Sequence, residues 1–176
     1  MLKHWSKLLT RDCTVVKIGK YTVYPIHRVG FTSLMYDADM TYTNAEISSL
    51  GHIDVLIRDP KARFVSGVNE YCRQNNLDIH EVYKKLKHDE LVDTHFIPQY
   101  VWLLNLYRFY KGEITIRPFP FIANITDVHK RKDESITPIE PLKRFTEVDS
   151  EIIKNTTVQR TFPLADIIKD YKHVLS

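Results

Sequence analysis

The sequence contains no run of apolar residues long enough to cross a membrane. No stretch approaches the roughly 18 residues that a membrane-spanning helix needs. The first residues, MLKHWSKLLTRDC, lack the continuous apolar core of a secretory signal peptide. This pattern predicts a cytoplasmic protein without a membrane span.

Cysteine is also scarce, because only Cys13 and Cys72 occur in the 176 residues. Their spacing matches no metal-ligand pattern, so no metal site is expected. So few cysteines are typical of a protein in a thiol-reducing compartment, although two are enough for one disulfide.

The chain lacks a strong excess of charge of either sign, since 25 lysines and arginines are balanced by 22 acidic residues. The net charge of +3 suits a small anionic ligand but is too weak to predict DNA or RNA binding. A hydrophobic fraction of 43% is high enough to exclude a disordered chain. Without internal repeats or a linker, residues 1–176 are predicted to form one domain.

The most informative segment is residues 52–67, with the sequence HIDVLIRDPKARFVSG. Its apolar, β-branched first half predicts a buried strand. Asp59 is suited to cap a following helix, and Pro60 to occupy the first helical position. Arg58 and Ser66 then lie near the carboxyl end of the strand, where ligands bind in open α/β sheets. A guanidinium, a hydroxyl and a helix N-terminus together suit a phosphate-like anion.

A second strand-to-helix turn follows the predicted strand at 21–26. Residues 27–34 have the sequence HRVGFTSL, in which Arg28 supplies charge while Thr32 and Ser33 supply hydroxyl donors. The segment lacks the GxxxxGK[ST] spacing of a Walker A loop. On its own, the segment is better explained as an ordinary turn between a strand and a helix.

The remaining pattern alternates strands with helices and so predicts an α/β domain. The expected elements are a hairpin within 14–26 that turns at Gly19-Lys20, strands over 41–43 and 113–118, and helices over 32–38, 44–50, 60–75, 78–88 and 99–110, with weaker helical patterns over 150–154 and 163–174.

These segments resemble the nucleotide-binding elements of sulfotransferases that use 3′-phosphoadenosine 5′-phosphosulfate (PAPS). Residues 58–67 look like that family's 3′-phosphate motif, RDPxxRxxSx, and residues 27–34 look like its 5′-phosphosulfate loop, PKxGxTSL. The sequence DTHFIPQ at 93–99 is similar to the HxxPQ loop of the carbohydrate-sulfotransferase branch. The charged segment 129–135 lies where that branch has a segment that closes over the nucleotide. The four segments follow the family's order, and the resemblance covers about residues 21–135.

The resemblance implies a three-layer, P-loop-like α/β fold, with a central, mainly parallel sheet flanked by helices. It also implies transfer of the sulfuryl group from PAPS, as co-substrate, to a hydroxyl acceptor such as a carbohydrate, without a metal. Arg58 and Ser66 would bind the 3′-phosphate, and Arg131 or Lys132 would approach the same side. The 5′-phosphosulfate would be held by five consecutive residues: Val29, Gly30, Phe31, Thr32 and Ser33.

Two positions depart from the family pattern. Arg28 stands at the loop lysine, which neutralises charge on the bridging oxygen as sulfate leaves, and a planar guanidinium is not equivalent to a compact ammonium. His27 replaces the usual proline. The interval from Leu34 to His52 is also short, so we expect an acceptor site that is small, open or built from the C-terminal region.

Such a reaction needs a general base to take the proton from the acceptor hydroxyl. His95 is the leading candidate because it lies in the HxxPQ-like loop, and Glu46, Asp37 and His52 are the alternatives. For each of them a surface or structural role is the competing interpretation.

Two other classes of protein stay open. A P-loop-like nucleotide kinase or phosphotransferase would need a Walker A loop and magnesium ligands, and the sequence shows neither. A catalytically inactive nucleotide-binding protein derived from a sulfotransferase is favoured by Arg28 and by the short middle of the chain. The sequence does not identify the acceptor or the oligomeric state.

Overall fold

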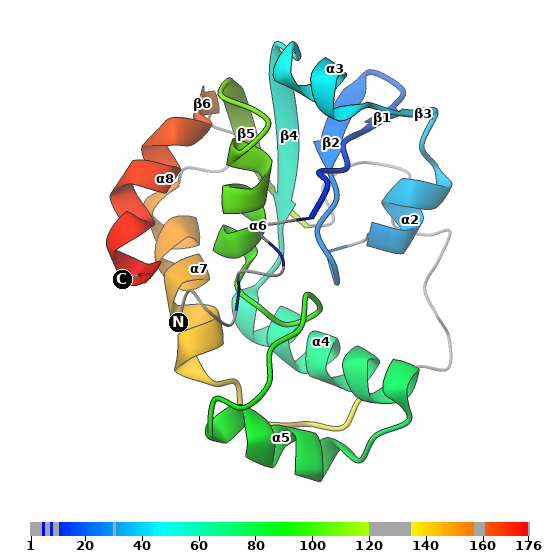
Figure 1. Ribbon diagram of the computed structural model, residues 1–176, viewed down its shortest axis with the longest axis vertical. Helices are drawn as coiled ribbons and strands as arrows, with labels where there is room; N and C mark the ends of the chain where they lie inside the picture. Colours follow the sequence, from blue (N-terminus) through cyan, green and yellow to red (C-terminus); the bar gives the residue numbers. More distant parts are fainter. Residues whose placement is uncertain are drawn as a thin grey trace.

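A computed structural model describes residues 5, 8, 11–29, 31–119, 135–156 and 161–175. Within these residues the chain forms an α/β domain with one six-stranded mixed sheet, seven α-helices and a short 3-10 helix (Figure 1). The strands are β1 (Val16–Ile18), β2 (Tyr21–Tyr24), β3 (Met40–Thr41), β4 (His52–Ile57), β5 (Glu113–Pro118) and β6 (Thr161–Pro163). The helices are α2 (Phe31–Tyr36), α3 (Asn44–Ser48), α4 (Pro60–Asn75), α5 (Ile79–Lys87), α6 (Gln99–Tyr107), α7 (Lys143–Asn155), α8 (Leu164–Tyr171) and η1 (Lys172–Leu175).

The strand order is β3-β1-β2-β4-β5-β6, and only the central pairs β2–β4 and β4–β5 are parallel. The pairs β1–β2, β1–β3 and β5–β6 are antiparallel, so the prediction of a mainly parallel sheet is wrong. The reversal between β1 and β2 is a tight hairpin at Gly19, whose φ of 56° suits glycine. Because β2 and β4 remain parallel, the residues that follow them, Arg28 among the first and Arg58 among the second, lie at the same edge of the sheet.

Local signals fix the helix that leaves this edge. The Asp59 side chain accepts a hydrogen bond from the Ala62 N–H at 2.9 Å, and Pro60 occupies the first turn. The helix ends where Asn76 adopts a left-handed φ of 52°. The predicted helix over 60–75 and the predicted strand over 113–118 are therefore confirmed with the same bounds.

The C-terminal region differs most from the prediction. Helix α7 begins at Lys143, well before the predicted 150, because Phe145, Val148 and Ile152 form a buried stripe that extends over its full length. Strand β6 was not predicted, since three residues are too few to show an alternating pattern.

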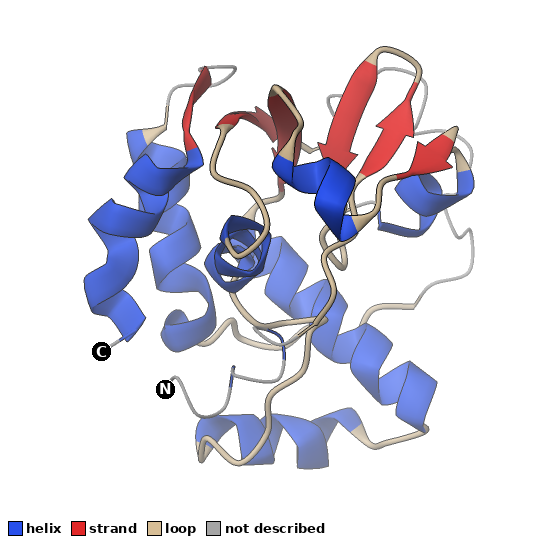
Figure 2. Ribbon diagram, turned by 45° about the horizontal axis from the view of Figure 1, so that its top comes forward, coloured by secondary structure: helices blue, strands red, loops and turns tan. Residues whose placement is uncertain are grey.

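Two groups of buried side chains hold the domain together. One joins the sheet to α6, where the Tyr24 hydroxyl donates a hydrogen bond to the Trp102 carbonyl at 2.8 Å. The other joins α4 to α7 through the rings of Phe64, Phe96 and Phe145, with centroids 5.4–6.3 Å apart. In Figures 1 and 2, α4 and α5 lie beyond the edge of the sheet at which β4 ends.

The two cysteines, Cys13 and Cys72, are buried and free, so they form no disulfide with each other. In the part of the chain that the structure describes, no helix combines the length and the apolar character needed to cross a bilayer.

Candidate functional site

The carboxyl edge of β2 and β4 brings Arg28 together with Arg58 and Ser66, which lie 30 and 38 residues further along the chain. The Arg58 guanidinium donates to the Arg28 carbonyl at 2.9 Å, and Arg28 Nε donates to Ser66 Oγ at 2.8 Å. Arg28 adopts a φ of 63°, which is unusual for a residue with a side chain. Two turns and the start of α4 therefore meet at one cluster of anion-binding groups, which we call the arginine corner (Arg28, Arg58 and Ser66).

A buried carboxylate borders the arginine corner. Glu70 lies one helical turn after Ser66, and its Oε2 atom is 3.6 Å from an Arg28 guanidinium nitrogen. Arg73 pairs with the same oxygen. The Arg28 side chain thus spans a hydroxyl and a carboxylate, and an anion that enters this corner competes with Glu70 for Arg28.

The backbone of Arg58 is fixed by an amide side chain from the next layer. Gln99 Oε1 accepts from the Arg58 N–H at 3.0 Å, and Gln99 Nε2 donates to the Arg58 carbonyl at 2.9 Å. Asp149 of α7 accepts from the Gln99 N–H at 2.7 Å and the Tyr100 N–H at 2.9 Å, which caps the start of α6. Burial raises the pKa of Asp149, although Arg63 and these hydrogen bonds oppose the change. The position of Arg58 therefore depends on α7, which the sequence did not connect to the site.

Arg63 is almost fully buried and links α4 to both loops of the site. Its guanidinium donates to the carbonyls of His27 at 2.9 Å, Ile97 at 2.5 Å and Thr94 at 3.3 Å. Burial lowers the pKa of Arg63 to about 10, so the side chain stays charged at neutral pH. The second arginine of the RDPxxRxxSx pattern is thus used to join loops in this structure.

The HxxPQ-like loop places His95 beside these groups. The His95 ring stacks on the ring of His27, with centroids 4.8 Å apart, and His27 directly precedes Arg28. The His95 carbonyl lies against α4 at Gly67, where an added Cβ would come within 2.0 Å of the oxygen. His95 therefore contacts the residues that adjoin Arg28 and Ser66 in the sequence, His27 and Gly67.

His27 is a neutral aromatic element of this packing. Burial, followed by the charges of His95, Arg11 and Arg63, lowers the pKa of His27 from 6.5 to about 3. Its Nδ1 atom shares a hydrogen bond with Thr94 Oγ1 at 2.8 Å, and its ring packs edge-on against Phe31.

This pKa predicts a loss of stability in acid. The unfolded chain binds a proton at His27 below about pH 6.5, whereas the folded chain does so only near pH 3, so the free energy of unfolding falls as the pH drops between these values. In urea denaturation at pH 7 and pH 5, we expect His27→Phe to lose roughly 1 to 2 kcal/mol less than the wild type on acidification. Equal losses in both proteins would contradict the neutral state of His27.

The structure places two of the alternative bases, Glu46 and His52, away from this site. Helix α3 precedes β4, and Glu46 is exposed there, with its carboxylate accepting from Thr43 Oγ1 at 2.9 Å. His52 begins β4 and shares a hydrogen bond with Thr115 Oγ1 at 2.6 Å. Asp37 follows α2 on the way to β3. Glu46 and His52 therefore lie at the opposite edge of the sheet from Arg58, because they come before β4 and Arg58 comes after it.

The predicted 5′-phosphosulfate segment is only partly described. Val29 is buried, and its N–H donates to the Ile26 carbonyl at 3.0 Å, so this N–H is already used inside the turn. Phe31 begins α2 and packs on His27. The remaining predicted contacts lie outside the described residues or side chains, and for these the prediction stays a prediction: Gly30, Thr32, Ser33, Arg131 and Lys132.

Comparison with known proteins does not extend this description, since no protein-family model, curated protein or solved structure matches the chain. A small cavity of about 30 Å³ lies beside Trp102, between Arg11 and Phe31, and has room for about one water molecule. It does not include Arg28, Arg58 or Ser66. The chemistry that the described residues offer is therefore that of the arginine corner: two guanidinium groups and a hydroxyl for an anion, with an imidazole close by.

Proposed function

We propose that the chain is a PAPS-dependent sulfotransferase with a P-loop-like α/β fold, and that its acceptor is a hydroxyl group, with carbohydrates as the first class to test. One observation carries the proposal. Arg28 comes from the segment that resembles the 5′-phosphosulfate loop, Arg58 and Ser66 come from the segment that resembles the 3′-phosphate motif, and Arg28 is hydrogen-bonded to both of them, to Ser66 through its side chain and to Arg58 through its carbonyl.

In this proposal Arg58 and Ser66 bind the 3′-phosphate. The Ser66 hydroxyl is held by Arg28 in the structure, so nucleotide binding exchanges this contact for one to phosphate. Arg28 then stabilises negative charge on the transferring group and on the bridging oxygen. Sulfuryl transfer needs alignment and charge stabilisation more than covalent catalysis, which suits a site made of fixed cations.

His95 is the general base of the proposed reaction. It receives the proton of the acceptor hydroxyl while the acceptor oxygen attacks sulfur and the sulfur–oxygen bond to the 5′-phosphate breaks. Its support is its position beside His27 and Gly67, in contact with both segments that form the arginine corner.

A catalytically inactive nucleotide-binding protein is the second candidate. The observation that favours it is the ion pair between Arg28 and the buried Glu70, because a cation held by a carboxylate is less available to a transferring sulfuryl group.

Two measurements separate these functions. In isothermal titration calorimetry we expect 3′-phosphoadenosine 5′-phosphate to bind at least about 10-fold more tightly than 5′-AMP, because only the former offers a 3′-phosphate. Equal affinities would contradict the proposed 3′-phosphate site. Transfer of labelled sulfate from PAPS to a panel of carbohydrate, phenol and peptide acceptors then distinguishes an enzyme from a nucleotide-binding protein.

A further inference from the structure

Asp93 makes two contacts with His95 through a single oxygen. Its Oδ1 atom accepts from the His95 backbone N–H at 2.9 Å and lies 2.5 Å from His95 Nδ1. Burial of the carboxyl acts to raise the pKa of Asp93, but the hydrogen bonds from His95 outweigh it, so this pKa lies below its ordinary value. The carboxylate is therefore charged at neutral pH and faces Nδ1.

The loop has contacts that hold its shape besides this carboxylate. The backbone carbonyl of Asp93 accepts from the N–H groups of Phe96 at 3.3 Å and Ile97 at 3.1 Å, and Arg63 donates to the Thr94 and Ile97 carbonyls. None of these contacts uses the side chain of Asp93. The carboxylate therefore contacts the His95 ring in addition to the backbone N–H that it accepts in the turn.

The other groups around His95 leave Asp93 as its charged partner. His27 stacks on the ring and is neutral at neutral pH, while the charge of Arg63 is directed to backbone carbonyls. The charge of Arg11 contributes to the lowered pKa of His27. Burial and the charge of Asp93 raise the pKa of Tyr71, a residue of α4. Among the described residues, Asp93 is the carboxylate in contact with the imidazole.

We propose that Asp93 is a positioning residue that keeps the proton of His95 on Nδ1 and leaves Nε2 as the basic atom. This inference rests on the proposed sulfotransferase function. The acceptor hydroxyl gives its proton to Nε2 as the bond from its oxygen to sulfur forms. The bond between sulfur and the 5′-phosphate oxygen breaks, and the bisphosphate leaves with the electron pair. Asp93 stabilises the imidazolium that results.

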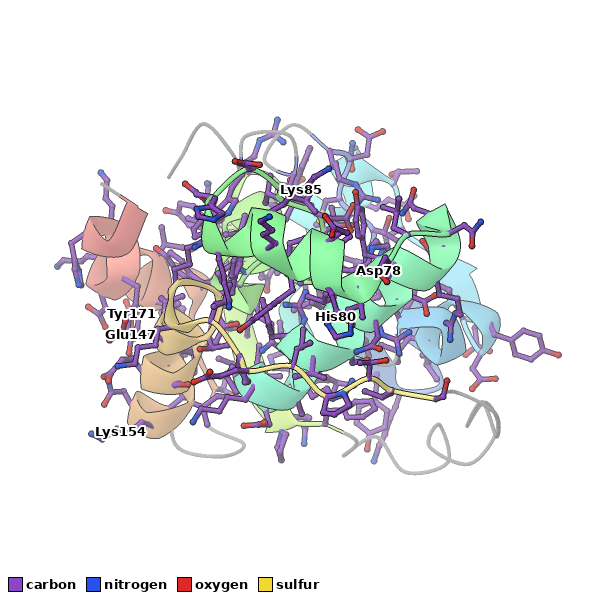
Figure 3. All side chains as sticks on the ribbon, turned by 90° about the horizontal axis from the view of Figure 1, so that it is seen from below. Asp78, His80, Lys85, Glu147, Lys154 and Tyr171 are labelled. Carbon is purple, nitrogen blue, oxygen red and sulfur yellow. The ribbon has the colours of Figure 1, made fainter. Side chains whose placement is uncertain are left out.

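The chain offers a matched control in a second aspartate two residues before a histidine. Asp78 accepts from the N–H groups of His80 at 2.9 Å and Glu81 at 3.1 Å, as Asp93 does from His95. Figure 3 labels Asp78, which caps the start of α5, and His80 in the helix, seen from below the molecule. Both are exposed and lie outside the arginine corner, so Asp78→Ala removes a helix cap without touching the site.

The experiment compares Asp93→Ala, Asp93→Asn and Asp78→Ala in the full chain. We expect NMR to show a His95 Nδ1–H resonance in the wild type, assigned by its absence in His95→Gln. The resonance is lost in Asp93→Ala and kept in Asp78→Ala.

We expect kcat for sulfate transfer to fall about 10- to 100-fold in Asp93→Ala, and less in Asp93→Asn, which keeps an acceptor oxygen. The affinity for 3′-phosphoadenosine 5′-phosphate stays within about twofold in all three variants.

Retention of the Nδ1–H resonance or of full kcat in Asp93→Ala would overturn the proposal. If Asp93→Ala does not fold, as judged by thermal unfolding, Asp93→Asn decides it: an unchanged kcat in that variant overturns the role of the charge. If the wild type transfers sulfate to no acceptor, the sulfotransferase proposal fails. The resonance would still show whether Asp93 fixes the Nδ1–H tautomer.

Discussion

Replacing Arg58 with alanine is expected to weaken binding of 3′-phosphoadenosine 5′-phosphate about 100-fold and to change the affinity for 5′-AMP by less than about threefold. The reason is that Arg58 supplies a guanidinium at the end of β4, in contact with Arg28, and only the bisphosphate carries a 3′-phosphate for it. Isothermal titration calorimetry with both nucleotides measures the two affinities in one protein preparation. Arg58→Lys should fall in between, because an ammonium keeps the charge but not the planar fork.

The control for Arg58→Ala is Lys85→Ala, which removes the same charge from an exposed position on α5 (Figure 3). We expect this variant to bind both nucleotides as the wild type does. Equal losses of affinity for the two nucleotides in Arg58→Ala would show that Arg58 does not recognise the 3′-phosphate. Weaker binding in Lys85→Ala as well would point to a general effect of net charge.

The parts of the fold with local signals were predicted well from the sequence. Helix α4 has an aspartate cap, a proline in its first turn and an asparagine at its end, and all three act within a few residues of the chain. The shared edge of the two turns follows from one rule of sheet topology, because parallel strands place the residues that follow them at the same edge. The direct contacts of Arg28 with Ser66 and Arg58 were not predicted, since the resemblance assigns Arg28 and the other two residues to different ends of the nucleotide.

The contacts that support the site could not be predicted in this way, because they join segments that are distant in the sequence. Asp149 lies 50 residues from Gln99, and nothing around either residue indicates that a carboxylate of α7 caps α6. The one sequence signal for this contact was that Asp149 adjoins the apolar stripe formed by Phe145 and Val148. Glu46 likewise became an alternative base because of its order in the sequence, whereas the topology places α3 at the opposite edge.

The pairing of Arg28 with Glu70 bears on the proposed function and was not part of the sequence pattern. The RDPxxRxxSx pattern ends before residue 70, so the carboxylate that borders Arg28 was not considered. The Arg28 side chain reaches both Ser66 and Glu70. In the proposed function, nucleotide binding would have to replace at least the contact to Ser66 before Arg28 could act on a sulfuryl group.

His95→Ala is expected to lower kcat for sulfate transfer by about 10²- to 10⁴-fold, which is the usual contribution of a general base. The affinity for 3′-phosphoadenosine 5′-phosphate should stay within about twofold, because the described contacts of the arginine corner do not involve the His95 side chain. Steady-state kinetics with PAPS and titration with the bisphosphate separate the two effects. His80→Ala, an exposed histidine on α5, is the control and should keep full activity (Figure 3).

A fully active His95→Ala variant would remove His95 from the mechanism, and the role would not pass to Glu46 or His52, since both precede β4 and Arg58 follows it. A parallel loss of nucleotide affinity and kcat would mean instead that His95 supports the turn before Arg28 through its stacking on His27. Only a fall in kcat at constant nucleotide affinity assigns the proton transfer to His95, because removal of a base raises the barrier to reaction without changing the groups that bind phosphate.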